Sequence, residues 1–216
     1  MSTPLWITRL VPDPRNATAR KDLNSAVALH HRIMAFFPDG LGDRARQQAG
    51  VLFRIEESPG RETTILIQSG LRPVPERLPE TYGAAQTKPL DPLLDQLRTG
   101  DRVHYRLVAN ATRKLGRNTQ DGCPHQVKPL YGADADAWWE RQAARAGLDI
   151  LSVRSMSLSD ATGRRVDGAH RITHARTRFD GIASITDAGA LRTAIVHGIG
   201  RGKSYGCGLL STIPVR

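Results

Sequence analysis

Apolar and polar residues alternate along the first part of the chain in a pattern that predicts strands and one amphipathic helix. Residues 5–10 form a short run typical of a strand, and residues 22–37 carry apolar side chains at helical spacing. A Pro-Asp-Gly sequence ends that helix. Two further β-type runs, 51–56 and 63–69, are separated by a Ser-Pro-Gly turn and predict a hairpin.

The next segment predicts a loop, a short helix and a strand. Residues 72–92 are rich in proline, Asp91 and Pro92 suit the start of a helix, and residues 102–109 return to β composition. The predicted order is therefore strand, helix, strand, strand, helix, strand. This order would place residues 1–110 in one domain.

After residue 110 the pattern partly recurs, although the first strand of the second unit is missing or displaced. The predicted elements are helix 134–146, strands 148–157 and 169–182, helix 186–197 and strand 204–214. Two successive units of this kind predict an α+β protein with tandem ferredoxin-like domains, the four-stranded arrangement that RNA-recognition modules also use. The second domain would span residues 111–216.

The charge of the chain favours a polyanionic partner. Lys and Arg number 31 against 21 Asp and Glu, which gives a formal net charge of +10. Nucleic acid is the default partner for such a surface, and the alternative is that the arginines reflect a GC-rich genome and solubility. Only 5% of residues are aromatic. Backbone contacts to a helical stem therefore fit better than base stacking on a sheet.

Two stretches concentrate this positive charge, and a solvated surface is the alternative reading for each of them. Residues 161–178 form a predicted basic hairpin with a single acid, Asp167, and residues 106–128 form a loop-like stretch with Asp121 alone. The residues expected to bind RNA in these stretches are Arg164, Arg165, Arg171, Arg176 and Arg178 in the first, and Arg113, Lys114 and Arg117 in the second.

Other classes of protein find little support. No apolar run reaches 18 residues, and the N-terminus lacks the basic-then-apolar order of a signal peptide, so we expect a soluble, cytoplasmic protein without a membrane partner. Cys123 and Cys207 are too few for a disulfide framework or a zinc site, although Cys123 and His125 could add two ligands to a larger set. We expect reduced thiols, no bound metal and no cofactor.

The most informative segment is 198–208, where five glycines surround two cations. Such spacing exposes backbone N–H groups that can hold phosphate, and the alternative is a tight turn that needs positive φ angles. The spacing fits neither a Walker A loop nor a dinucleotide-binding fingerprint. The residues expected to contact phosphate are Gly200, Arg201, Gly202, Lys203 and Ser204.

The stretch GIGRGKSYGCGLLS resembles the C-terminal glycine-rich loop of the repeat-associated RNA-binding superfamily, and specifically that of the CasE endoribonucleases. Weaker similarity at 29–38 and 105–110 extends the resemblance over nearly the whole chain. It implies a tandem ferredoxin-like enzyme that cuts each CRISPR repeat RNA at the base of its hairpin. The enzyme would then stay on the mature guide RNA beside the other subunits of the type I-E Cascade complex.

Metal-independent cleavage would use the ribose 2′-OH as the nucleophile and leave 2′,3′-cyclic phosphate and 5′-OH ends, so the protein must move protons and stabilise charge. The resemblance places the catalytic histidine at His30, with His31 in reserve. His30 falls within the apolar stripe of its helix, and a hydrogen-bonded core residue is the alternative. The family tyrosine one turn earlier is Val27 here. Lys203 is therefore the first candidate for stabilising the oxyanion, and Arg32 is the second. The alternative is that both are solvated surface cations.

Two rival functions remain open at this level. A non-catalytic RNA-binding subunit of the same superfamily would keep the glycine loop and the basic hairpin but would need no histidine beside the cleaved phosphate. A general RNA chaperone would bind RNA in a salt-sensitive way without preferring a hairpin.

Overall fold

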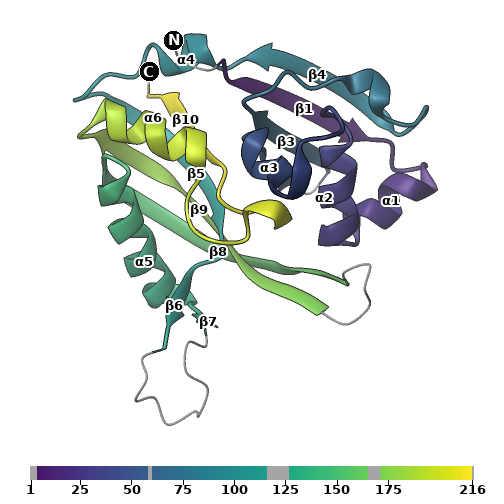
Figure 1. The fold of residues 1–216 in the computed structure, drawn as a ribbon. Coiled ribbons are helices and arrows are strands. Elements are labelled where there is room, and N and C mark those ends of the chain that lie inside the picture. Colours follow the sequence, from purple (N-terminus) through teal and green to yellow (C-terminus); the bar gives the residue numbers. More distant parts are fainter. Residues whose placement is uncertain (1–3, 58–59, 116–126, 165–170, 216) are drawn as a thin grey trace.

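The computed structural model describes residues 4–57, 60–115, 127–164 and 171–215, and its two four-stranded antiparallel sheets lie side by side (Figure 1). In each sheet the first strand of the unit lies between the last and the third. This is the strand order of a ferredoxin-like domain. The predicted tandem ferredoxin-like fold is confirmed.

The first unit has the sheet order β2-β3-β1-β4. Helices α1 and α2 follow β1, but between β3 and β4 only a short 3₁₀ turn, η2, replaces the second helix. Its elements are β1 (Trp6–Pro12), α1 (Ala17–Leu23), α2 (Ala26–Met34), η1 (Gly42–Arg44), α3 (Ala45–Gln48), β2 (Leu52–Glu56), β3 (Thr64–Ser69), η2 (Pro75–Arg77) and β4 (Gly83–Pro89).

The second unit has the order β10-β5-β9-β8 and both helices of the ferredoxin-like pattern. Its strands β8 and β9 are long and extend beyond the sheet as a two-stranded arm that reaches below α2 (Figure 1). The elements after β4 are α4 (Asp91–Leu94), β5 (Arg102–Ala109), β6 (Thr112–Lys114), β7 (Val127–Pro129), α5 (Gly132–Arg145), β8 (Leu148–Arg164), β9 (Arg171–Ile185), α6 (Ala188–His197), η3 (Lys203–Tyr205) and β10 (Leu210–Pro214).

The strand β5 corrects the predicted assignment of elements. It was expected to close the first unit, but it pairs with β9 and β10 and is the missing first strand of the second unit. The place it was expected to take is filled by β4, which pairs with β1 and which we predicted as loop. The division expected after residue 110 therefore does not follow the sheets.

The predicted hairpin of β2 and β3 is confirmed, but the predicted helix 22–37 is two helices. The chain leaves α1 at Asn24, and the Ser25 side chain then accepts a hydrogen bond from the Ala28 N–H as the N-cap of α2. The last strand begins at Leu210, later than the predicted residue 204, because η3 occupies 203–205.

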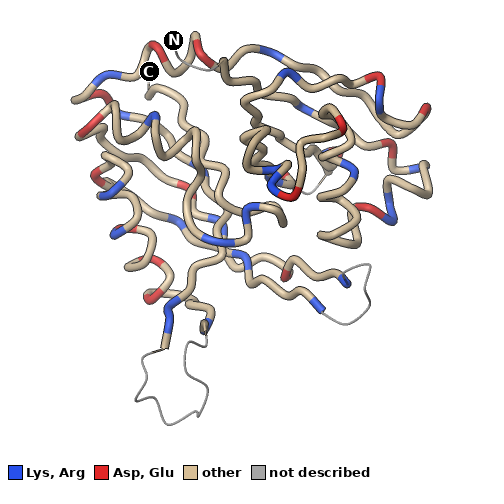
Figure 2. The backbone as a smooth tube through the Cα atoms, in the orientation of Figure 1, with Lys and Arg blue, Asp and Glu red and all other residues tan. Residues whose placement is uncertain are grey.

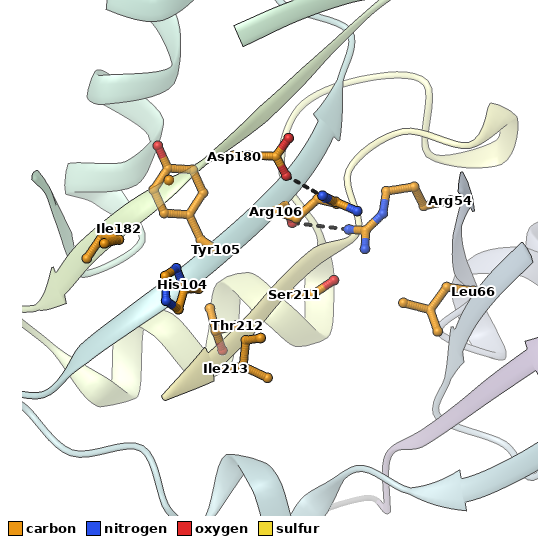
Figure 3. Close-up of a pocket in the computed structure, with 11 residues that line it drawn as sticks. Arg54, Leu66, His104, Tyr105, Arg106, Asp180, Ile182, Ser211, Thr212 and Ile213 are labelled. Carbon is orange, nitrogen blue, oxygen red and sulfur yellow. Dashed lines mark hydrogen bonds and ion pairs between the residues drawn. The ribbon is translucent and has the colours of Figure 1, made fainter. Parts of the chain in front are cut away.

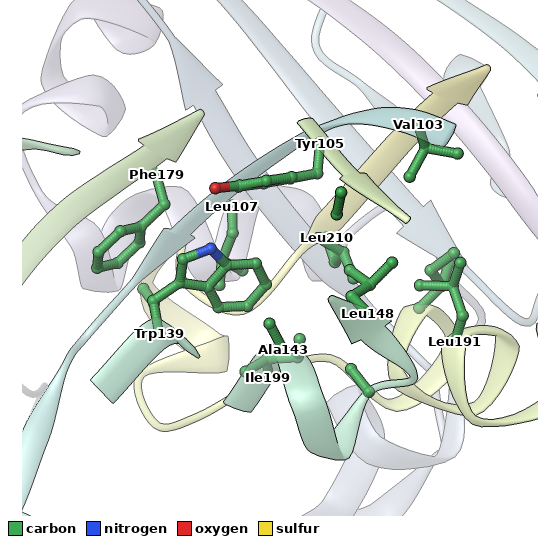
Figure 4. Packing of buried hydrophobic residues seen from close by; sticks show 14 of the residues in the cluster. Val103, Tyr105, Leu107, Trp139, Ala143, Leu148, Phe179, Leu191, Ile199 and Leu210 are labelled. Atoms are coloured by element: carbon green, nitrogen blue, oxygen red, sulfur yellow. The ribbon is translucent and has the colours of Figure 1, made fainter. Parts of the chain in front are cut away.

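Each sheet buries one face against its own helices. In the second unit the Trp139 ring of α5 stacks on Phe179 of β9 with centroids 5.9 Å apart, and Tyr105 of β5 packs beside it (Figure 4). The Tyr105 hydroxyl donates to the Ser152 carbonyl over 2.9 Å, so this buried polar group is satisfied. Burial of this aromatic cluster fixes β5, β9 and α5 as one rigid body.

The two units meet along the edge strand β2. The buried Arg54 side chain donates to the carbonyls of Arg106 and Leu209, each over 3.1 Å, and the Gln68 amide donates to the Ile195 carbonyl over 2.7 Å. These bonds hold the segment between α6 and β10 against the first sheet. Among the described residues, no helix has the length and apolarity needed to cross a membrane.

Candidate active site

Helix α2 carries His30 at the junction of the two units. Its buried face consists of Val27, Leu29 and Ile33, and the side chain of His30 is half-buried next to this face. The His30 Nδ1 atom is buried and has no hydrogen-bond partner among the described residues. His30 is therefore not a core histidine satisfied by hydrogen bonds, which was the alternative reading of its position.

Val27 explains how closely the arm approaches α2. A Cβ atom at Gly163 of β8 would lie 2.8 Å from the Val27 Cγ2 atom, so only glycine fits there. The position at which the resemblance implies a tyrosine thus holds a buried aliphatic contact with the arm. The reserve candidate His31 is exposed, with its ring centroid 5.9 Å from that of His30.

The glycine-rich loop lies directly against α2, because η3 contacts both α2 and β2. All five of its glycines have positive φ angles, between 71° and 91°. The turn alone therefore accounts for all five glycines, which was the alternative to phosphate binding. The number of glycines is consequently no evidence for phosphate binding.

Evidence of another kind bears on phosphate binding by this loop. Lys203 and Ser204 begin η3, so their N–H groups have no acceptor within that turn. Arg201 is exposed, and its backbone pairs with that of Asn110. The loop thus offers backbone donors and an exposed cation next to α2, which η3 contacts.

The Lys203 ammonium donates to the His197 carbonyl at the end of α6 over 2.8 Å. An ammonium group has three donors, so two remain for an anion. Arg32, the second candidate for this role, is paired with Asp22 over 2.7 Å, and its guanidinium lies over the Tyr82 ring. Of the two predicted stabilising cations, only Lys203 lies in the loop beside α2.

Sequence analysis missed Arg46, the cation next to both His30 and Lys203. It lies in the short helix α3, where its guanidinium donates to the Val51 carbonyl over 2.9 Å and forms no ion pair among the described residues. No apolar periodicity in the sequence predicts α3. The fold brings Arg46 close to His30, which lies 16 positions earlier in the chain, and to Lys203, which lies 157 positions later.

The pKa values at this site reflect crowded positive charge. Burial, followed by the charges of His31 and Arg46, lowers the pKa of His30 to about 4. Burial and Arg46 also lower the pKa of Lys203, and burial lowers the pKa of Arg46 itself. A bound anion would relieve this repulsion, so the cluster is suited to hold a phosphate.

Two more rings complete the site. The Tyr205 ring, at the end of η3, meets the His30 ring edge-on at a centroid distance of 6.2 Å and stacks on His174 of β9 at 5.2 Å. Burial, and after it the charge of Arg201, lowers the pKa of His174. We predicted no role for either residue, and the alternation along β9 is the only sequence signal that places His174 on the side of the loop.

The predicted basic hairpin is the β8–β9 arm. Arg164 and Arg171 face each other across its outer end, and both are exposed. Figure 2 shows basic positions along this arm and in β6. Arg113 and Lys114 are exposed in β6, while Arg117 and Arg165 lie outside the described residues, as do Cys123 and His125.

Two arginines of the predicted RNA-binding set are already engaged inside the arm. Arg176 donates to the Ser159 carbonyl over 2.7 Å, and Arg178 pairs with Asp180 at 2.8 Å. Asp180 also pairs with Arg106, which in turn pairs with Glu56 of the first unit. Arg178 and Asp180 are two residues apart on one strand, so their shared face was a signal available in the sequence.

On the other side of the junction, the open faces of both sheets form a cleft of about 470 Å³ (Figure 3). Arg54, Arg106 and Asp180 lie at its centre, and the dashed contacts in Figure 3 are the ion pair of Arg106 with Asp180 and the hydrogen bond from Arg54 to the Arg106 carbonyl. The cleft lacks the unpaired cations of the His30 side. Cys207 is buried and free, and no three His, Cys, Asp or Glu residues in the described ranges are grouped as metal ligands.

Together, the fold and the site define a class of protein: two ferredoxin-like units with a histidine and a cationic glycine-rich loop at their junction. The family model described as "CRISPR associated protein" matches residues 5–214. The chain therefore belongs to the CRISPR associated protein family.

Three relatives narrow this assignment. The "CRISPR-associated endoribonuclease Cse3" of Thermus thermophilus is 28% identical over 97% of this chain and 100% of its own length. A structure of Thermus thermophilus Cse3 "bound to an RNA representing a pre-cleavage complex" has a TM-score of 0.80 at 26% identity, covering 98% of this chain and 100% of that chain.

The second relative is the "CRISPR system Cascade subunit CasE" of Escherichia coli, 27% identical over 87% of this chain and 91% of the relative. The third is a chain of a "CRISPR RNA-guided surveillance complex, pre-nicking", 42% identical with a TM-score of 0.71 over 97% of this chain and 100% of that one. The resemblance to the CasE family that the glycine-rich loop indicated is confirmed.

Proposed function

We propose that this chain is a metal-independent endoribonuclease that cuts CRISPR repeat RNA at the base of its hairpin and stays bound to the mature guide RNA. The observation that carries the proposal is that Arg46 lies close to both His30 and Lys203 at the junction of the two units, while neither cation forms an ion pair among the described residues. A histidine beside unpaired cations suits a reaction in which a phosphate binds and a proton moves.

The reaction is an internal transfer at the phosphate. The 2′-oxygen loses its proton and attacks the adjacent phosphorus, and the bond from phosphorus to the 5′-oxygen breaks. That oxygen takes up a proton, so the products carry a 2′,3′-cyclic phosphate and a 5′-OH. With a pKa lowered to about 4, His30 is neutral at pH 7 and is able to accept a proton, while Lys203 and Arg46 stabilise the negative charge on the phosphate.

We expect the β8–β9 arm and β6 to hold the RNA stem. Arg164 and Arg171 project from the outer end of the arm, close to the α2 side of the molecule, and their exposed guanidinium groups match phosphates of an A-form helix. The structure of Thermus thermophilus Cse3 bound to RNA supports this use of the fold. Arg113, Lys114 and Arg117 would extend the same contact.

Retention of the product would make this chain a subunit of Cascade. The 42% identical chain in an RNA-guided surveillance complex and the Escherichia coli subunit CasE support this partner. Such an assembly works on transcribed RNA, so we place the protein in the cytoplasm. The rival function is a non-catalytic RNA-binding subunit. It would need the arm and the loop but would not need the half-buried His30, whose Nδ1 atom has no hydrogen-bond partner among the described residues.

One experiment tests the proposal. Labelled repeat RNA is incubated with the protein in EDTA, beside scrambled RNA of the same length and a repeat that carries a 2′-deoxy nucleotide at the mapped cleavage position. We expect an undiminished rate on the repeat, none on the 2′-deoxy RNA, and a product resistant to phosphatase until acid opens its cyclic end. Strict dependence on Mg²⁺ or Mn²⁺, or cleavage of the 2′-deoxy RNA, would rule out this mechanism.

A further inference from the structure

Tyr205 joins the two units through its ring. It contacts His30 of α2 edge-on, with an angle of 65° between the rings, and it lies nearly parallel to His174 of β9, at 22°. Both distances, 6.2 and 5.2 Å, fall in the range of favourable aromatic pairs. A histidine from each unit therefore packs on the same tyrosine.

The backbone holds Tyr205 in place on both sides. The flanking Gly202 and Gly206 are left-handed, with φ of 72° and 80°, and the Tyr205 N–H donates to the Gly202 carbonyl over 2.8 Å. The backbone of the buried Asn110 pairs with that of Arg201 just before this turn, and its amide donates to the Ala175 carbonyl of β9 over 2.7 Å. A Cβ at Gly206 would approach the Phe53 ring to 3.3 Å, so the turn also fits closely against β2.

We propose that Tyr205 is the positioning residue of His30: its ring, backed by His174, fixes the imidazole and keeps water from its buried side. This inference rests on the proposed function, since it assumes that the His30 imidazole takes part in proton transfer. The ring performs this role, because both contacts of Tyr205 are ring contacts. Its hydroxyl has no recorded hydrogen bond within the part of the chain that the structure describes.

The surroundings of His30 explain why a ring is needed there. The positive charges of His31 on the same helix and Arg46 of α3 act on it, and Asp160 and Arg176 of the arm line a small cavity together with Leu29 and Tyr205. No hydrogen bond orients the His30 Nδ1 atom in the described structure. Packing must therefore orient the imidazole, and among recorded ring contacts only those with Tyr205 and the exposed His31 are available.

The test compares Tyr205→Leu, which removes the ring, with Tyr205→Phe, which keeps it. Single-turnover cleavage, repeat RNA affinity, melting temperature and the His30 pKa by NMR are measured for each, with His30→Gln used to assign the resonance. Tyr131→Leu, which removes an exposed tyrosine before α5, is the matched control.

We expect Tyr205→Leu to slow cleavage by about 10- to 100-fold with affinity within about threefold, because small displacements of a catalytic group cost rate more than binding. The His30 pKa should rise from about 4 toward its ordinary value as water gains access. Tyr205→Phe should stay within about threefold of wild type in rate. His174→Leu should move the rate and the pKa in the same direction as Tyr205→Leu, by a smaller amount.

Three results would overturn the inference: equal losses in Tyr205→Phe and Tyr205→Leu, which would assign the role to the hydroxyl; a parallel fall of rate, affinity and melting temperature; or an unchanged His30 pKa. Failure of the proposed function looks different. In that case His30→Gln would cleave at the wild-type rate, whereas the pKa measurement would still report whether Tyr205 packs on His30.

Discussion

Two regions rich in basic side chains lie at the junction of the ferredoxin-like units, and they differ in what neutralises them. On the side of the open sheet faces, Arg54, Arg106 and Arg178 are paired with Glu56 and Asp180. On the side of α2, Arg46 lies close to His30 and to Lys203, and both cations donate only to backbone carbonyls in the described structure.

The comparison shows that pairing, and not residue type, separates structural arginines from those free to bind an anion. In the paired region two carboxylates neutralise most of the charge of three arginines, and the ion pairs link the two units. The unpaired region keeps its positive charge, so a phosphate would be its neutralising partner. A sequence count of arginines assigns both regions to RNA, whereas the structure favours only the second.

The largest expected effect is that of His30→Ala on the rate of cleavage. Proton transfer contributes roughly 10²- to 10⁴-fold to rate and little to ground-state binding. We therefore expect cleavage to fall by that factor while repeat RNA affinity stays within about threefold of wild type. Single-turnover kinetics and a binding titration on the same preparation measure both.

A melting curve provides the control for His30→Ala. If His30 were a structural residue, the substitution would lower stability by about 1 to 3 kcal/mol and reduce binding together with cleavage. A stable and fully active His30→Ala protein would transfer the role to His31. Wild-type activity in the His30/His31 double mutant would remove α2 from the mechanism.

A smaller effect, on binding, should separate the arginines of the arm. Alanine at Arg164, Arg165 and Arg171 should weaken binding of the repeat hairpin, and each lost phosphate contact should flatten the log-log salt dependence by roughly 0.7 to 0.9. Arg178→Ala is the matched comparison, since Arg178 is paired with Asp180 in the same arm. It should leave the slope unchanged. If the salt dependence of binding flattened equally in both proteins, ion pairing would not separate the arginines that bind RNA from those that do not.

The fold was predictable where periodicity is strong. The hairpin of β2 and β3, the helices α5 and α6, strand β9 and the first part of β8, as far as residue 157, follow from apolar spacing. The strand β4 was not predictable in this way, because it is a largely exposed edge strand in which no apolar alternation marks a buried face. The sheet membership of β5 depends on long-range pairing, which local patterns do not encode.

The site was predictable only in part, for a related reason. His30 and the glycine-rich loop could be found because a helix position and a specific motif mark them. Arg46, His174 and Tyr205 could not, because what brings them together is the docking of β2 and η3 across the junction. Residues in three separate elements carry no common spacing in the sequence.

The smallest expected effect is the contribution of His30 to the pH dependence of the free energy of unfolding. The pKa of His30 is lowered to about 4 in the folded protein, against about 6.5 for an unfolded histidine. Between these values the unfolded chain binds a proton that the folded protein does not, so His30 reduces the free energy of unfolding as pH falls from about 6.5 to 4. The loss should be under about 3 kcal/mol, since partial exposure screens it.

Chemical denaturation of wild type and His30→Gln at pH 7 and pH 4.5 measures this effect, and the difference between the two proteins cancels the other titrating groups. We expect wild type to lose more stability than His30→Gln over this interval. An anion that binds the unpaired cations should shrink the difference, because it neutralises Arg46 and Lys203 and lets His30 take up a proton while folded. An equal loss in both proteins would mean that the pKa of His30 is not lowered in the folded protein. The unpaired positive charge of this region would then have no effect on His30.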